Sequence, residues 1–424
     1  MTNIILTQYD GAILGPIARL LGWVMNGIYN LMDHAFGIQN IGLSIIILTF
    51  VIYLCMLPVT YKQQKYSKLS QQMQPELLKV QKKYEGKKDQ ASMQRMQEES
   101  QMIYEKYGVS PTGSCLYMFI SFPILLALYR VVYNVPAYIG SVKNIFTDAV
   151  SGIMATDGFA GKLTQFISDN KVMLTKTADF ANEDKTVVSN FVVDTLYKMG
   201  NDGWNAIDKV FGGLTDVFET TRTNLDHVNN FLGLNIGESP LKIMQSAFAD
   251  KAWLLLIGAL LIPVISWLTQ VLNLKLMPSA ANVDNDQMSR QMKTMNTVMP
   301  LFSLVMCFTV PVGLGLYWIA GSVFRSGQQL ILNKHFAKID LDDIIAKNQE
   351  KAKKKREKMG IAENQITNAA RLNTRNNTSL SNGYTEEEKE KLLEEANAKR
   401  QTAKAGSMTA KANMVREFNE RNNK

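Results

Sequence analysis

The stretch TMNTVMPLFSLVMCFTVPVGLGLYWIAGSVFRSGQQLILN occupies residues 294–333, and Arg325 is its only charged side chain. A helix needs about 20 apolar residues to cross a bilayer. The stretch is therefore too long for one membrane span and long enough for two. Pro311 and Gly313 mark the turn between them. The first of the two spans then has only about 16 residues, a length that thins the local bilayer.

Three more uncharged stretches precede this pair and predict three earlier spans. The first is IGLSIIILTFVIYLCMLPVT at 41–60. The second, at 111–135, is uncharged except for Arg130, and the third occupies 251–275 between two lysines. Length and lack of charge together predict an all-α membrane protein with five transmembrane helices.

Residues 1–40 are expected to form an N-terminal extracellular segment with an interfacial helix. Apolar side chains gather on one helical face (Ile17, Leu20, Leu21, Val24, Ile28, Leu31) and polar ones on the other (Arg19, Asn26, Asn30, Asp33). Such a helix suits the membrane surface. A sixth, poor span is the alternative, but Arg19 and Asp33 would be costly at depth. We expect no cleaved signal peptide, because a basic n-region and a cleavage site are lacking.

The orientation follows from basic residues, which favour the cytoplasmic side. The segment 61–110 holds ten basic and six acidic residues, and the tail 334–424 holds twenty and fourteen. The segment 136–250 holds nine and fourteen. We therefore expect 61–110, 276–293 and the tail in the cytoplasm, and 136–250 outside. The N-terminus is then outside and the C-terminus inside.

The three larger segments between and after the spans differ in character. The segment 61–110 predicts a cytoplasmic helical hairpin that turns at Glu85–Lys88. The segment 136–250 predicts a large extracellular insertion with some helix. The tail 334–424 is basic and poor in aromatic residues, which is typical of disorder or a lone helix.

Several motifs resemble the YidC family of membrane protein insertases, whose relatives serve mitochondria and chloroplasts. They are GLSIIILTFVIYLCMLPVTYKQQ (42–64), QMQPELLKVQKKY (72–84), YGVSPTGSCLYMFISFPILLALY (107–129), LIPVISWLTQVLNLKLM (261–277) and VPVGLGLYWIAGSVFRSGQQLILNK (310–334). Together they cover about 15–135 and 252–335. The resemblance implies a five-helix core around a hydrophilic groove that is open to cytoplasm and lipid. It implies insertion and folding of client segments, with no nucleotide, metal or other cofactor.

The chain departs from the family at one position of the implied groove. Many members carry an arginine five residues before the proline of the first span, where this chain has Tyr53 before Pro58. Arg325 lies at a similar depth in the last span, so we expect it to supply the groove charge. Arg130 is the other candidate. The competing interpretation is that Arg325 extends to the membrane surface or forms a structural pair.

Other polar and aromatic residues of the spans are candidates for lining the groove. They are Thr49, Tyr53, Tyr129, Gln270, Asn273, Tyr317, Trp318 and Gln328. Each could instead stabilise helix packing, because such side chains often bond between membrane helices.

The expected location is the bacterial plasma membrane. The expected partners are newly made membrane proteins, membrane lipids, the ribosome through the basic tail, and the Sec translocon. Whether the protein works alone or beside that translocon stays open. A polytopic transporter is the alternative function, but it predicts internal repeats that the sequence lacks. An enzyme is not expected, since no catalytic motif is present.

Overall fold

The computed structural model describes residues 8–87, 89–109, 115–276 and 287–358, which form two units, Met1–Asn348 and Gln349–Lys424. The fold is all-α apart from one short ribbon, as expected. Most of the predicted tail, and residues 277–286 of the predicted 276–293 loop, lie outside the described residues. Of the second unit, the end of one helix is described.

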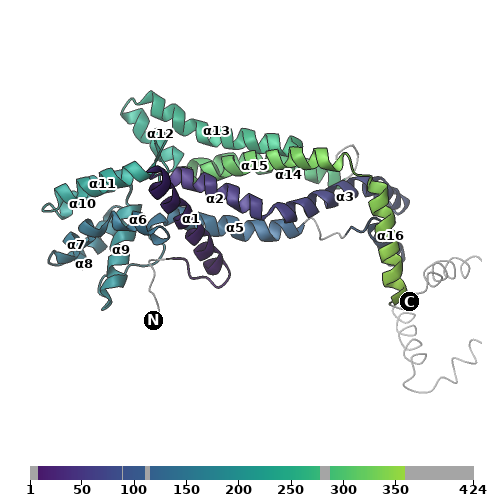
Figure 1. Cartoon of the computed structure of the whole chain (residues 1–424), viewed down its shortest axis with the longest axis horizontal. Helices are drawn as coiled ribbons and strands as arrows, with labels where there is room; N and C mark the ends of the chain where they lie inside the picture. Colours follow the sequence, from purple (N-terminus) through teal and green to yellow (C-terminus); the bar gives the residue numbers. More distant parts are fainter. Residues whose placement is uncertain (1–7, 88, 110–114, 277–286, 359–424) are drawn as a thin grey trace, which may run out of the picture. The chain divides into compact units, whose positions relative to one another are not determined.

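The elements follow one another along the chain as labelled in Figure 1. They are α1 (Leu14–Phe36), α2 (Ile41–Cys55), α3 (Leu57–Lys83), α4 (Gln90–Tyr107), α5 (Cys115–Tyr133), the 3₁₀ turn η1 (Val135–Ala137), α6 (Gly140–Asn144), α7 (Thr147–Ala155), α8 (Phe159–Asp169), α9 (Lys185–Lys198), α10 (Gly200–Val210), α11 (Thr215–Asn229), β1 (Asn230–Phe231), β2 (Leu234–Asn235), α12 (Pro240–Ala249), α13 (Trp253–Leu276), α14 (Gln287–Thr309), α15 (Val312–Phe336) and α16 (Leu341–Lys358).

Five apolar helices, α2, α5, α13, α14 and α15, form what we call the bundle, in which α15 packs against both α2 and α13 (Figure 1). Within the part of the chain that the structure describes, α13 is long and apolar enough to cross a membrane by itself. The pair α2 and α3 also reaches that length and apolarity, with a bend of 58° between them.

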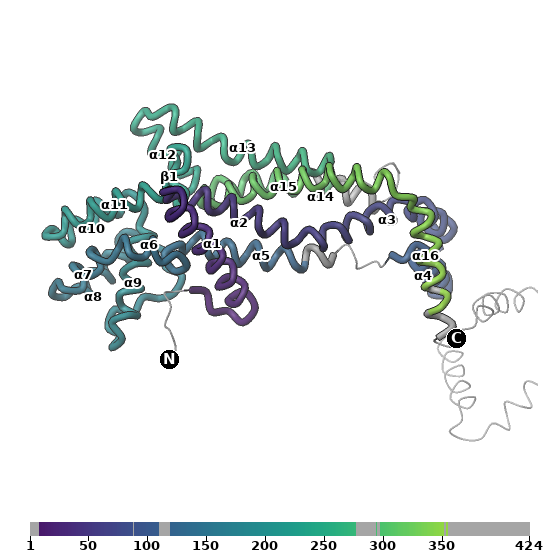
Figure 2. Tube along the Cα trace, viewed as in Figure 1, coloured from purple at the N-terminus to yellow at the C-terminus, as the bar shows by residue number. Residues whose placement is uncertain are grey.

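The bend divides the predicted first span, 41–60, between two helices. The structure ends α2 at Cys55 and begins α3 at Leu57, so the second helix starts inside the predicted span (Figure 2). Pro58 explains the break, because proline lacks an N–H and its ring clashes with the carbonyl four residues earlier. The same residue suits the first turn of α3.

The predicted turn within 294–333 is confirmed. Helix α14 ends at Thr309, and Pro311 is the residue that precedes the first turn of α15. Gly313 is needed there for space, because a Cβ atom would come within 3.0 Å of both Ile45 and Val132. At its other end α14 begins at Gln287, seven residues before the predicted boundary.

Residues 136–250, which we call the insert domain, hold the helices α6 to α12 and the β1–β2 ribbon. Their core contains fully buried Phe146, Ile153 and Leu196. The insert domain is joined to the bundle by backbone hydrogen bonds. The N–H groups of Val312 and Gly313 donate to the carbonyls of Glu238 (2.8 Å) and Ile236 (3.0 Å).

Helix α1 is amphipathic, and the stripe that it packs into the core is offset from the apolar face predicted for the membrane interface. Ala18, Met25 and Tyr29 pack into the core, whereas Leu20 and Leu31 of the predicted apolar face are exposed. The buried stripe is rotated by roughly a quarter of a turn from that face. Apolar side chains therefore cover two sides of α1. One side packs against the core, and the other is exposed.

The predicted 61–110 segment is a helical hairpin of α3 and α4. Ion pairs join its arms at Lys83–Glu99 (2.5 Å) and Lys106–Glu76 (2.7 Å). The arms share a small core of their own, formed by Leu69, Met73, Leu77, Tyr107, Val109 and Ile345. Ile345 belongs to α16, so the start of that helix completes the hairpin core. The Asn348 side chain adds a bond to the carbonyl of Tyr107 (3.0 Å).

Candidate functional site

Polar side chains at intervals of mostly three or four residues form one stripe along the apolar helix α15. The stripe consists of Ser322, Arg325, Ser326, Gln329 and Asn333. Residues at this spacing share a helix face. The stripe meets polar groups of α13, α2 and α3, and we call the whole set the polar seam.

Arg325 is half-buried and is held against α2 and its own helix. Its Nε donates to the carbonyl of Gly321 (3.2 Å), and its Nη2 donates to Ser322 Oγ (3.1 Å). Its guanidinium carbon lies 5.8 Å from the centre of the Tyr53 ring, within cation–π range. Both bonds go to the preceding turn. The head group therefore points toward the start of α15 and away from the predicted cytoplasmic end.

Tyr53 owes its position to a missing side chain on α15. A Cβ atom at Gly321 would lie 2.9 Å from the Tyr53 hydroxyl and 3.0 Å from its ring. The ring is buried and fills the space that this glycine leaves. Gly321 thus lets the ring lie directly beside the Arg325 guanidinium.

Gln328 connects α15 to the break between α2 and α3. Its Nε2 donates to the backbone carbonyl of Tyr53 (3.0 Å), which lies in the last turn of α2. The last four carbonyls of a helix lack intrahelical partners. The Gln328 side chain therefore stabilises the end of α2, while its Oε1 is buried and accepts no hydrogen bond from the residues that the structure describes.

Asn333 ties three helices together at the hairpin end of the polar seam. Its Oδ1 accepts from Gln64 Nε2 of α3 (2.9 Å) and from Gln329 Nε2 (3.0 Å). Its Nδ2 donates to the carbonyl of Leu276 at the end of α13 (3.1 Å). In an apolar environment such a set of satisfied amides fixes the relative register of the helices.

Helix α13 contributes the remaining polar groups of the seam. Asn273 Nδ2 lies 3.4 Å from Ser326 Oγ, and Gln270 Nε2 donates to Ser266 Oγ (3.1 Å). Asn273 and Ser266 are buried between the helices. The seam therefore runs along the contact between α13 and α15, as well as along the contact between α2 and α15.

The structure brings five of the ten predicted site residues into the seam: Tyr53, Gln270, Asn273, Arg325 and Gln328. It adds others that the prediction missed, namely Gln64, Ser266, Ser322, Ser326, Gln329 and Asn333. The periodic stripe of α15 was the signal that could have found four of them. Gln64 and Ser266 carry no such signal, since only tertiary packing brings them to the seam.

Three predicted residues lie in packed surroundings of the bundle. Thr49 is fully buried, and its hydroxyl donates to the Ile45 carbonyl of its own helix (2.6 Å). Tyr317 is buried in the main hydrophobic core, and Trp318 packs against that core while half-buried. These contacts are of the kind that stabilise helix packing.

The other two, Arg130 and Tyr129, lie at the insert-domain end of α5. The Arg130 guanidinium stacks on the Tyr9 ring at 4.6 Å, and the Tyr129 ring stacks on Tyr133 at 5.5 Å. Burial lowers the pKa of Lys198 to about 8, Asp194 opposes this shift, and the charge of Arg130 adds to it. The charge of Arg130 therefore acts on a lysine of the insert domain.

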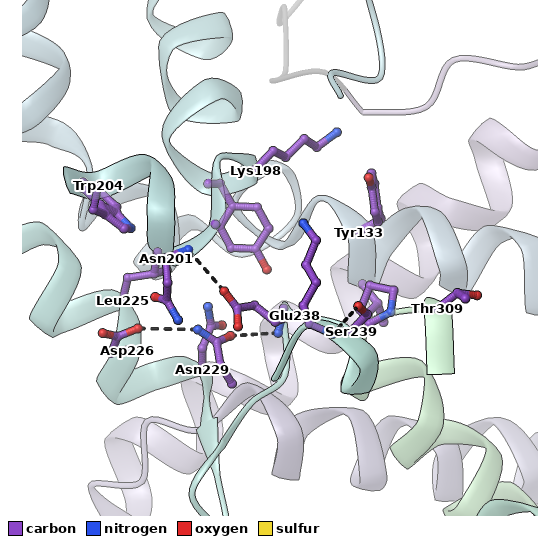
Figure 3. Close-up of a pocket in the computed structure, with 17 residues that line it drawn as sticks. Tyr133, Lys198, Asn201, Trp204, Leu225, Asp226, Asn229, Glu238, Ser239 and Thr309 are labelled. Carbon is purple, nitrogen blue, oxygen red and sulfur yellow. Dashed lines mark hydrogen bonds between the residues drawn. The ribbon is translucent and has the colours of Figure 1, made fainter. Parts of the chain in front are cut away.

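A separate cavity of about 170 Å³ lies where the insert domain meets α5 and the α14–α15 turn (Figure 3). Its wall includes the Glu238 carboxylate, which accepts from the Asn201 N–H (3.2 Å). Burial raises the pKa of both Glu238 and Asp226. Asn229, only 3% exposed, also lines it. None of the polar seam belongs to this cavity.

Comparison with known proteins identifies the family to which the chain is similar. The model of the family described as 60Kd inner membrane protein matches residues 31–179 and 191–339. The membrane protein insertase YidC of Oceanobacillus iheyensis is 23% identical over 316 residues, which is 74% of this chain and 81% of that relative.

Two relatives match more closely over a shorter length. The membrane protein insertase YidC of Bifidobacterium longum is 36% identical over 135 residues, 31% of this chain and 40% of the relative. The membrane protein insertase MisCA of Bacillus subtilis is 40% identical over 131 residues, 30% and 46% of the two chains. The matches thus span less than half the length of these two relatives.

Proposed function

The chain belongs to the 60Kd inner membrane protein family, the family of YidC, and from this premise we propose that it is a membrane protein insertase. It receives hydrophobic segments of newly made membrane proteins in a hydrophilic groove, and it inserts and folds them into the bilayer. The observation that carries this proposal is a charged and hydrogen-bonding seam, centred on Arg325, between the apolar helices of the bundle.

In the proposed topology, α2, α5, α13, α14 and α15 are the five spans of a bacterial plasma membrane protein. Helices α2, α13 and α15 begin at the insert domain, and α5 and α14 end there, as five alternating spans require. Charge distribution supports an external insert domain and a cytoplasmic hairpin and tail. The N-terminus is then outside, where α1 lies in the membrane interface with its open apolar side toward lipid.

The seam lowers the cost of moving a client's polar tail through the bilayer. An arginine at mid-span costs about 2.5–3.5 kcal/mol on insertion scales, so it needs polar or aromatic neighbours. Ser322 and Tyr53 supply them. The guanidinium then attracts acidic groups on the incoming tail, while the amide and hydroxyl groups along the seam replace its lost hydration. We propose Thr49, Tyr317 and Trp318 as lesser contributors to client contact.

The basic tail is proposed to meet the ribosome, because clusters of lysine and arginine bind RNA phosphates. Membrane lipids and the Sec translocon complete the proposed set of partners. The insertase does no covalent chemistry in this proposal. Its work is to bind a segment, shorten the apolar distance that a tail must cross, and release the segment into lipid.

Insertion by the purified protein in proteoliposomes tests the role of Arg325. The client is a single-span protein whose translocated tail is either acidic or neutral, and protease protection is the measurement. We expect Arg325→Ala to reduce insertion of the acidic-tailed client on the order of tenfold, the equivalent of about 1.4 kcal/mol. The neutral-tailed client should be far less affected, and Arg325→Lys should keep most activity.

Arg130→Ala is the matched control, because it removes the arginine of α5 without touching the seam. Equal loss for both clients, or no loss for either, would show that Arg325 does not act on client charge. A wild-type protein that inserts no more client than empty liposomes do would overturn the insertase proposal itself.

A further inference from the structure

The tip of the β1–β2 ribbon holds an apolar side chain in an unusual position. Leu232 and Gly233 form its two-residue loop, with φ angles of 53° and 85°. Loops of this type need positive φ at both residues and favour Asn, Asp or Gly at the first. A leucine there is strained, and the Leu232 side chain is 88% exposed. The chain thus keeps a large apolar group where both the local backbone and water disfavour it.

The first strand of the ribbon is fixed to the start of α2. Asn40 Nδ2 donates to the Asn230 carbonyl (2.7 Å), and Asn40 Oδ1 caps α2 by accepting from Leu43 N–H (2.9 Å). The Phe231 side chain packs so closely on Gly42 that a Cβ atom there would lie 2.7 Å from it. One asparagine therefore holds both the membrane helix and the ribbon.

The second strand is fixed to the starts of α13 and α15. Leu234 approaches Gly258 of α13, where a Cβ atom would be 3.7 Å away. Ile236, just after the strand, accepts the hydrogen bond from Gly313 of α15. The ribbon therefore contacts both α2 and α13 near their starts, and β1 lies at the end of the bundle where α2 begins (Figure 2).

Other large apolar side chains near these helix starts are also exposed. Phe36 and Ile38 lie just before α2, and Trp253, Leu254 and Ile257 lie in the first turns of α13. Exposed apolar patches mark protein or membrane contacts. Here the patch continues into the exposed side chains Leu261 and Leu268 further along α13. That continuity favours lipid over a protein partner, and aromatic residues are common at the membrane–water interface.

We propose that the ribbon tip is a lipid anchor, with Leu232 inserted among the acyl chains of the outer leaflet beside α2 and α13. The anchor holds the insert domain at the membrane surface. Burial in lipid removes the exposed apolar surface and offsets the backbone strain of the loop. This inference rests on the proposed external location of the insert domain and the proposed span α13.

Nitroxide labels on single cysteines test the anchor in proteoliposomes of phosphatidylethanolamine and phosphatidylglycerol. The background carries Cys55→Ser, Cys115→Ser and Cys307→Ala. Collision with oxygen reports lipid, and collision with a water-soluble nickel chelate reports solvent. We expect the label of Leu232→Cys to be several-fold more shielded from the chelate than that of Asp157→Cys, an exposed position in the α7–α8 turn.

Leu268→Cys, on the exposed side of α13, is the lipid reference. If its label is in lipid while the label at 232 meets the chelate as freely as the one at 157, the anchor does not exist although the span does. If the label at 268 is itself in water, the membrane assignment fails. Shielding at 232 that disappears when protein is diluted in lipid would assign the tip to contact between copies and overturn the lipid anchor.

Leu232→Asn separates anchoring from folding, because asparagine suits the loop better than leucine and removes only the apolar group. We expect amide hydrogen exchange over 230–235 in nanodiscs to become several-fold faster than in the wild type. A tip that lies in water would instead exchange more slowly in this variant, because the loop would be less strained.

Discussion

Single residues decide where the charge of the polar seam lies. Family members often place an arginine at the position of Tyr53, whereas here the cation comes from α15 and rests on the Tyr53 ring. An aromatic ring attracts a guanidinium through its electron-rich face. Arg325 thus lies beside the residue at which the family resemblance implies an arginine, which is why we propose that Arg325 takes the place of that arginine.

Gly321→Ala tests whether this close contact is needed. The added methyl group would overlap the Tyr53 ring, and overpacking of this kind costs about 1–3 kcal/mol. We expect a lower midpoint of thermal unfolding in detergent and weaker insertion of acidic-tailed clients.

The matched control is Gly327→Ala, on the same helix, where no atom lies within 4 Å of the new Cβ. Alanine is the better helix former, so this variant should unfold at the same or a higher temperature. Equal behaviour of the two variants would mean that the Tyr53 ring can move aside without cost.

Depth along the predicted spans identifies the central pair of the site. Tyr53 and Arg325 were expected at similar levels of two spans, and they are in contact. Arg130 was the alternative, but it stacks on Tyr9 at the insert-domain end. No count along α5 could reveal this, since Tyr9 is more than a hundred residues away. Depth can be counted along a helix, whereas the direction of a side chain depends on its neighbours.

At the scale of elements, breaks in helices were partly predictable and docking was not. The turn at Pro311 followed from proline and glycine chemistry, but the bend at Pro58 was read as part of a continuous span. Residues 41–60 are apolar throughout and long enough for one span, so these two properties gave no sign of the bend. The docking of α16 on the hairpin was missed because the basic composition of the tail predicts disorder or a lone helix, and neither of these packs against other elements. Ile345 contributes to a packed core despite that composition.

Two glycines of the hairpin test the docking of α16. Both Gly86 and Gly108 have positive φ, but only at Gly108 would a Cβ atom meet α16, 2.5 Å from Asn348. Gly86→Ala should cost only the backbone strain, roughly 1 kcal/mol. Gly108→Ala should cost about 1–3 kcal/mol more because it also displaces Asn348.

Limited proteolysis of the purified protein is the measurement for this pair. We expect cleavage within α3, α4 and the start of α16 to be clearly faster for Gly108→Ala than for Gly86→Ala. If the two variants were cut at the same rate, the α16 contact would not stabilise the hairpin.

At the scale of the whole molecule, the insert domain has a buried carboxyl that couples its stability to pH. Asp194 of α9 is 3% exposed, and burial raises its pKa from 3.8 to about 6, although Lys198 opposes the shift. A carboxyl with a raised pKa binds its proton more tightly in the folded state. Its contribution to stability is therefore complete below pH 3.8 and is lost as pH rises to about 6.

Asp194→Asn should remove this loss, which is on the order of 3 kcal/mol at about 1.4 kcal/mol per pKa unit. The measurement is the free energy of unfolding of wild type and variant between pH 4 and 7. The difference in free energy of unfolding between variant and wild type should change with pH only between pH 3.8 and about 6. Asp157→Asn, an exposed carboxyl in the same domain, is the control. A pH-independent difference for Asp194→Asn would place the carboxyl in contact with water.

The family, the helical class and the order of helices could be predicted from apolar length and motif spacing. The architecture of residues 136–250 could not, because its short helices are held by a shared core of residues distant in sequence, such as Phe146 and Leu196. Such contacts leave little periodic signal. The same reason explains why Gln64 and Asn333 were missed although they lie at the junction of three helices.

The two backbone bonds that Glu238 and Ile236 accept from α15 have a consequence for shortening this protein. The first N–H groups of a helix have no partner of their own, and here the insert domain provides it. A shortened variant has to keep the strip around 230–240, because its deletion would leave the N–H groups of Val312 and Gly313 in α15 without partners at a buried position. The strip at the base of the insert domain is therefore inseparable from the bundle.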